Sequence, residues 1–103
     1  MNTINRITIT AKEIRGKCPV FSVGDKIVIE GPKIIKEKTD ALCVHALGSM
    51  LSMANALGHG ASFKELGLAK EERDVGYLQC LDPGPPYTLG GTVIFEIKRE
   101  AIT

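Results

Sequence analysis

The sequence predicts an α+β fold: a mostly antiparallel four-stranded sheet packed on one long helix plus a short helix, in the order β-β-α-α-β-β. One segment, residues 39–60, combines apolar residues at helical spacing with the length of a full helix. Four shorter segments flank it in two pairs, which favours one sheet with its apolar face on the helix. We expect residues 1–103 to form a single domain.

The first strand is predicted over residues 4–14, where apolar and polar side chains alternate with the period of a half-buried strand. Gly16 and Pro19 interrupt the pattern around Cys18, which should therefore lie in a loop beyond the strand end. The β-branched run at residues 26–30 predicts the second strand.

The long helix is predicted over residues 39–60, with Thr39 or Asp40 as its N-cap and Gly58 as its terminator. An apolar stripe at spacings of four and three should face the sheet. The stripe consists of Cys43, Leu47, Met50, Ala54 and Leu57, widened by Ala46 and Met53.

A capping-box pattern at Ser62 and Glu65 predicts the short second helix over residues 61–67. The third strand is expected at residues 77–81. The fourth is expected at residues 92–98, where alternation is clearest.

Composition excludes several classes of protein. Hydrophobic residues at 44 % and charged residues at 24 % are globular averages. Thirteen Lys and Arg balance twelve Asp and Glu without a long block of either sign, so we expect no nucleic-acid partner. No apolar run reaches the length of a signal peptide or membrane span, so we expect a cytoplasmic protein with no membrane contact.

The three cysteines are far apart in sequence and do not resemble the dense framework of a secreted disulfide domain. Cys18 follows the first strand, Cys43 opens the helix, and Cys80 closes the third strand beside Asp82. This placement at element ends could gather all three at one end of the sheet.

Three converging thiolates, with a fourth ligand from His45, His59 or Asp82, would complete a tetrahedral shell for zinc or hold an iron–sulfur cluster. The residues we predict for this metal site are Cys18, Cys43, Cys80 and His45. On a continuous helix, however, residues two apart point about 200° apart, so Cys43 and His45 should not share a face.

Other interpretations of the cysteines stay open. The thiols could act as a redox set, or Cys43 could be a nucleophile at a helix N-terminus, so whether the protein is an enzyme is undecided. Alternatively, each cysteine is simply a buried apolar residue. The protein would then be a non-catalytic interaction or assembly module that binds a protein partner through the open sheet face or the proline-rich Asp82–Tyr87 loop. In either case the open sheet face could pair with a copy of itself to form a homodimer.

Several segments together resemble a family of small prokaryotic proteins of unassigned function that is known mainly for its cysteines. They are Cys18-Pro19 followed by Val23-Gly24-Asp25, Asp40-Ala41-Leu42-Cys43 with His45-Ala46-Leu47, Cys80 with Asp82-Pro83, and Val93-Ile94-Phe95-Glu96-Ile97. The resemblance implies that the three cysteines are the marked positions. Such proteins are typically bacterial or archaeal, often from anaerobes, so the resemblance favours a soft-metal or redox role, but it carries no established reaction.

Overall fold

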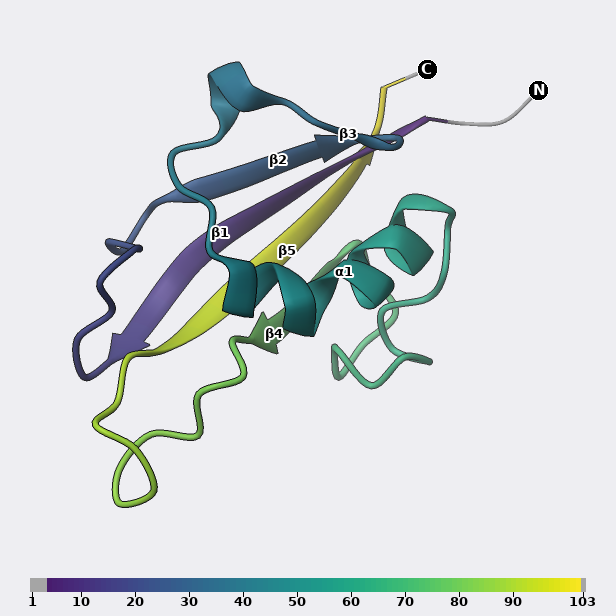
Figure 1. The fold of residues 1–103 in the computed structure, drawn as a ribbon. Helices are drawn as coiled ribbons and strands as arrows, with labels where there is room; N and C mark the ends of the chain where they lie inside the picture. The colour runs from purple at the N-terminus through teal and green to yellow at the C-terminus, as the bar shows by residue number, and fades with distance from the viewer. Residues whose placement is uncertain (1–3, 103) are drawn as a thin grey trace.

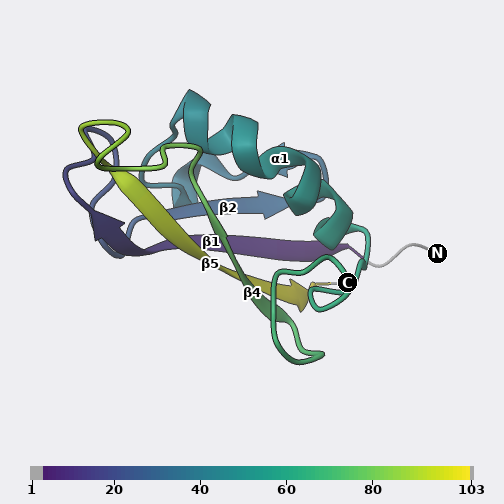
Figure 2. The same ribbon diagram turned by 90° about the horizontal axis from the view of Figure 1, so that it is seen from below.

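The structure, a computed structural model, describes residues 4–102. Its main elements are a five-stranded antiparallel sheet of order β3-β2-β1-β5-β4 and one α-helix lying across one face of that sheet (Figures 1 and 2). The elements are β1 (Asn5–Arg15), β2 (Lys26–Glu30), β3 (Lys33–Ile34), a 3-10 turn (Lys36–Lys38), α1 (Val44–Gly58), β4 (Val75–Gln79) and β5 (Thr92–Ala101). The predicted α+β class is confirmed. No helix in this part of the chain has the length and apolar character needed to cross a membrane.

The long central strands β1 and β5 carry most of the core. Their register pairs Ile9 with Ile97 and Ala11 with Phe95, and all four side chains are buried under α1. Phe21, from the loop after β1, packs edge-on against Phe95 with ring centroids 5.2 Å apart. The loop that carries Cys18 is thereby attached to the core.

The other face of the sheet carries cross-strand ion pairs. Arg6 bonds Glu30 on β2 at 2.8 Å and Glu100 on β5 at 3.0 Å, while Lys12 bonds Glu96 at 3.2 Å. Burial raises the pKa of Glu96, but hydrogen bonds and charge from Lys12 and Lys98 outweigh it and hold that pKa below its ordinary value. Paired charges suit a solvated face. A homodimer or partner contact through this face remains a prediction.

The helix begins later than predicted. Thr39 and Asp40 do not cap α1; they accept main-chain N–H groups of β2, Thr39 from Val28 at 3.1 Å and Asp40 from Lys26 at 2.9 Å. Because residues 39–40 are committed to the sheet, the chain stays extended through Cys43, which becomes the N-cap with φ −128°. At the other end Gly58 is the last helical residue rather than the predicted left-handed terminator. The first residue after α1 with a positive φ is Gly60.

The predicted strand count and the predicted second helix are wrong. Residues 61–67 form turns, although Ser62 accepts the N–H of Glu65 at 3.0 Å as a capping box requires. The Ser62 hydroxyl is bonded to Glu72 at 2.6 Å, and Gly67 at φ +81° turns the chain away from helix. The fifth strand, β3, has two residues and is too short to show an alternating pattern.

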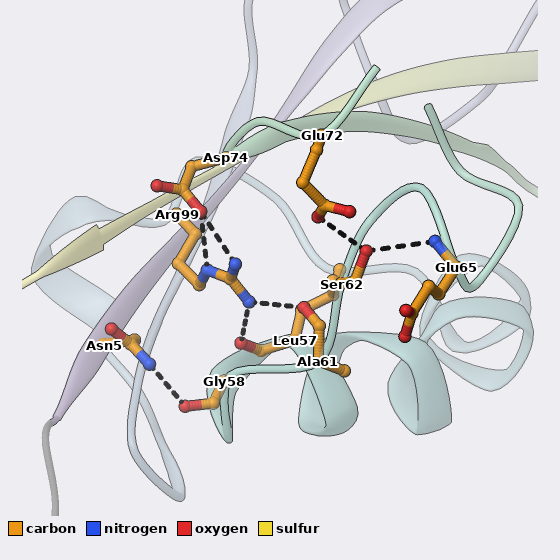
Figure 3. A network of polar contacts seen from close by, with 9 residues as sticks. All are labelled: Asn5, Leu57, Gly58, Ala61, Ser62, Glu65, Glu72, Asp74 and Arg99. Atoms are coloured by element: carbon orange, nitrogen blue, oxygen red, sulfur yellow. Dashed lines mark hydrogen bonds and ion pairs between the residues drawn. The ribbon is translucent and has the colours of Figure 1, made fainter. Parts of the chain in front are cut away.

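Arg99 of β5 anchors the C-terminal end of α1 (Figure 3). Its guanidinium donates to the carbonyl oxygens of Leu57 at 2.9 Å and Ala61 at 2.6 Å, and pairs with Asp74 at 2.7 Å. It also lies 5.0 Å from the ring centre of Phe63. Free carbonyls at a helix C-terminus favour a cation. This contact fixes one end of α1, and the helix directs its other end toward the loops after β1 and β4.

Candidate functional site

The predicted site residues line one cavity. The loop after β1, the N-terminus of α1 and the segment between β4 and β5 lie at the same end of the molecule (Figures 1 and 2). They line a small, partly open cavity of about 100 Å³ whose wall includes all four predicted ligands and Asp82. A larger and more open hollow of about 540 Å³ lies along residues 67–77, but neither cysteine nor histidine lines it. We therefore place the candidate site in the smaller cavity.

Two glycines allow the loops to meet. Gly91 has φ +105°, and a Cβ atom there would lie 2.6 Å from the Lys17 carbonyl oxygen and 3.6 Å from the Cα atom of Cys18. Gly16 has φ +86°, and a Cβ atom on it would lie 3.0 Å from the Gly91 nitrogen. Only glycine combines a positive φ with so close a main-chain approach. The contact places Cys18 beside Gly91, whose carbonyl oxygen accepts a hydrogen bond from the Cys80 thiol.

Main-chain donors hold two of the sulfur atoms. The Cys18 sulfur accepts the N–H of Phe21 at 3.3 Å, and the Cys80 sulfur accepts the N–H of Val93 at 3.2 Å. The Cys80 thiol also donates to the Gly91 carbonyl at 3.7 Å and is 7 % exposed. Cys43 differs, because its side chain caps no N–H of α1.

His45 and Cys43 both contribute to the cavity wall, although His45 is exposed and Cys43 is half-buried; the expectation that the two side chains point apart stays a prediction. That expectation assumed that both belong to the helix. Because Cys43 precedes α1 in an extended conformation and His45 is the second helical residue, helical geometry does not separate them. His59, the alternative fourth ligand, is the C-cap at the other end of α1, roughly 22 Å along a helix of this length.

Asp82 belongs to a structured turn after β4. Its Oδ1 accepts the Gly84 N–H at 2.8 Å and the Thr88 hydroxyl, while its carbonyl accepts the Thr92 hydroxyl at 2.8 Å. The bond from Thr88, then that from Gly84, holds the pKa of Asp82 below its ordinary value; burial opposes this shift, and the charge of His45 supports it. Thr88 was not among the predicted site residues, although the Asp-Pro-Gly turn indicates that nearby donors fold back onto Asp82.

The thiols line the cavity without forming a finished metal shell. Across residues 4–102, no three or more His, Cys, Asp and Glu side chains are arranged to hold a metal ion. All three cysteines are free thiols, with Cys80 buried and the other two half-buried. A shared ligand would therefore require the side chains to reorient.

Comparisons with family models, with curated proteins and with solved structures find no match for this chain. The resemblance to a prokaryotic three-cysteine family therefore remains an expectation. The fold and the cavity define a small α+β protein with three cysteine thiols lining one cavity.

Proposed function

We propose that the protein binds a soft metal ion in this cavity through the thiolates of Cys18, Cys43 and Cys80, with the imidazole of His45 as fourth ligand. The observation that carries the proposal is that three separate segments contribute these side chains to one cavity of about 100 Å³. Thiolate and imidazole are the ligands that zinc and copper(I) take in proteins, and iron–sulfur clusters use the same thiolates.

The hydrogen bonds to sulfur support this function. Main-chain N–H groups are directed at the sulfurs of Cys18 and Cys80. A metal-bound thiolate is an acceptor, and hydrogen bonds to ligand sulfurs tune metal–sulfur centres. Both bonds can persist when the thiols lose their protons, whereas the Cys80 donation to the Gly91 carbonyl is lost.

Binding would complete the site. Rotation of the cysteine side chains about their Cα–Cβ bonds would have to bring the sulfurs to distances near 2.3 Å from a shared ion. Each thiol gives up one proton on coordination, so affinity should rise with pH.

The test is anaerobic purification, followed by an absorption spectrum and quantification of bound metal. Reconstitution with Co²⁺ then reports thiolate ligation by sulfur-to-cobalt charge-transfer absorption. We expect Cys18→Ser, Cys43→Ser and Cys80→Ser each to reduce this absorption and His45→Asn to weaken binding. His59→Asn is the matched control and should bind like the wild type. A colourless, metal-free protein with three inaccessible thiols would instead favour the non-catalytic interaction module.

A redox function is the second candidate, because Cys18 and Cys43 are both half-buried on the same cavity while Cys80 is buried. In that case the thiolate of Cys43 would attack a disulfide substrate, forming a mixed disulfide and releasing the first substrate thiolate. The thiolate of Cys18 would then attack the Cys43 sulfur, displacing the second substrate thiolate and leaving a Cys18–Cys43 disulfide. Oxidation with glutathione disulfide followed by peptide mapping distinguishes the candidates. The redox function predicts this single intramolecular pair.

A further inference from the structure

Six exposed apolar side chains belong to the three segments that line the cavity, and we call them the apolar rim. These segments lie together at one end of the molecule (Figures 1 and 2). Single exposed apolar residues are common on protein surfaces, but a group of them in one place marks an interaction site. Leu89 is fully exposed and Val44 is 85 % exposed. The rim consists of Val20, which is itself on the cavity wall, and of Leu42, Val44, Leu81, Tyr87 and Leu89.

The same three segments are almost free of charge. Asp82 is the only Asp, Glu, Lys or Arg in residues 18–24, 41–47 and 80–91. Its carboxylate accepts hydrogen bonds from donors of its own turn. A charged partner would lose water of hydration at this surface without gaining a free counter-charge, which costs free energy. The apolar rim therefore suits an uncharged partner.

The volume of the cavity limits what can enter it. At about 100 Å³ it is well below the roughly 300–1,000 Å³ of pockets that take up whole small molecules. An apolar cavity of about 150 Å³ has room for one benzene molecule, so this cavity has room for one aliphatic side chain. Apolar side chains stand between the thiols on its wall, among them Phe21, Ala46 and Val93.

The segments are fixed before any partner arrives. Phe21 packs against Phe95 in the core with ring centroids 5.2 Å apart, and the Thr92 hydroxyl holds the Asp82 carbonyl at 2.8 Å. A surface that is already ordered loses little conformational entropy on binding. This favours binding of a flexible partner that supplies only a short segment.

We propose that the apolar rim is an interaction surface for an uncharged, apolar segment of another polypeptide, one aliphatic side chain of which enters the cavity. A membrane surface suits the rim less well, because interfacial binders place Lys and Arg beside their apolar residues, and residues 18–24, 41–47 and 80–91 contain neither. The inference goes beyond the proposed function, since it requires neither a bound metal nor a disulfide exchange.

The test is a ¹H–¹⁵N NMR titration of reduced, metal-free protein with an acetylated and amidated peptide that carries a central Val between two Leu, flanked by Ser and Gly. We expect saturable amide shifts confined to the three segments. Replacing the central Val of the peptide by Asp should weaken binding at least about fivefold, and so should Leu42→Asp or Leu89→Asp in the protein. Leu51→Asp is the matched control, because Leu51 is 48 % exposed and Leu42 is 47 % exposed, but Leu51 lies outside these segments.

The outcomes decide between occupants of the rim. Absence of saturable shifts in the folded protein, or equal losses of affinity in Leu42→Asp and Leu51→Asp, would overturn the proposal. Sedimentation velocity that shows a dimer of the wild type and a monomer of Leu89→Asp would assign the rim to a second copy of this chain. Co-sedimentation with phosphatidylcholine vesicles that Leu89→Asp abolishes, without peptide binding, would assign it to a membrane surface. Because Leu89 is fully exposed, its substitution should leave the fold intact.

Discussion

Gly91 lies against Lys17 so closely that a Cβ atom at position 91 would stand 2.6 Å from the Lys17 carbonyl oxygen. The residue also has φ +105°, a region that side-chain-bearing residues rarely adopt. The contact joins the loop that carries Cys18 to the segment that leads from Cys80 into β5. The position of the cavity wall therefore depends on Gly91, together with Gly16, which packs against it.

Gly91→Ala should destabilise the fold by roughly 1–3 kcal/mol and weaken Co²⁺ binding, because the two loops must separate. Urea denaturation and Co²⁺ titration measure the two effects. Gly48→Ala is the control: the site is helical, a Cβ there meets nothing within 4 Å, and stability should rise by up to about 1 kcal/mol. Wild-type stability and affinity in Gly91→Ala would contradict this account of the cavity.

Gly76→Ala should damage the core without altering the cavity. A Cβ atom at position 76 would lie 2.4 Å from Phe63 Cδ1 and 2.8 Å from the Leu68 carbonyl oxygen. Neither Phe63, which is fully buried, nor the main chain can move away easily, so the cost should be about 1–3 kcal/mol or more. Thermal unfolding measures the cost, and Co²⁺ affinity of the folded fraction should stay at the wild-type value.

Arg99→Met should destabilise the protein by about 1.5–3 kcal/mol, because the carbonyls of Leu57 and Ala61 lose a charged donor while the side-chain stem is retained. Asp74→Asn should cost less than about 1 kcal/mol, since the Asp74 side chain is 65 % exposed whereas that of Arg99 is 14 % exposed. Urea denaturation compares the two. Equal losses of unfolding free energy in the two variants would mean that Arg99 contributes to stability through its ion pair with Asp74 and not through its bonds to the helix C-terminus.

Asp82 should make stability depend on acid pH. Its folded-state pKa lies below the ordinary value of 3.8, through the Thr88 hydroxyl first and the Gly84 N–H second. The resulting stabilisation is present above the unfolded pKa and is lost as pH falls through the folded one. Thr88→Val should raise the pKa of Asp82, which an NMR titration of its carboxyl carbon reports. An unchanged titration midpoint would show that Thr88 does not hold this carboxylate.

The fold was predictable where local patterns coincide with tertiary packing. Alternation located β1 and β5, and helical spacing identified Ala46, Met50, Ala54 and Leu57, all of which are buried. The prediction failed where a polar side chain could either cap the helix or accept a hydrogen bond from a strand. Thr39 and Asp40 are good N-cap residues, but β2 takes both side chains, and no local rule reveals that competition.

That the three cysteines and His45 line one cavity was foreseeable from their placement in the sequence, but the geometry of the cavity was not. The three cysteines and His45 were predicted as metal ligands from their residue types and from their positions at the ends of strands and of the helix. Their shared cavity depends on the contact between Gly16 and Gly91, a tertiary contact between two loops far apart in the chain. The late helix start, which puts Cys43 and His45 on one wall, was equally hidden from a local pattern.

Anaerobic Co²⁺ titration of the reduced protein tests the central claim most directly. The account predicts saturation at one ion per chain, with sulfur-to-cobalt charge-transfer absorption that falls in each cysteine-to-serine variant and is unchanged in His59→Asn. Absence of charge-transfer absorption in protein whose three thiols are shown to be reduced would contradict it.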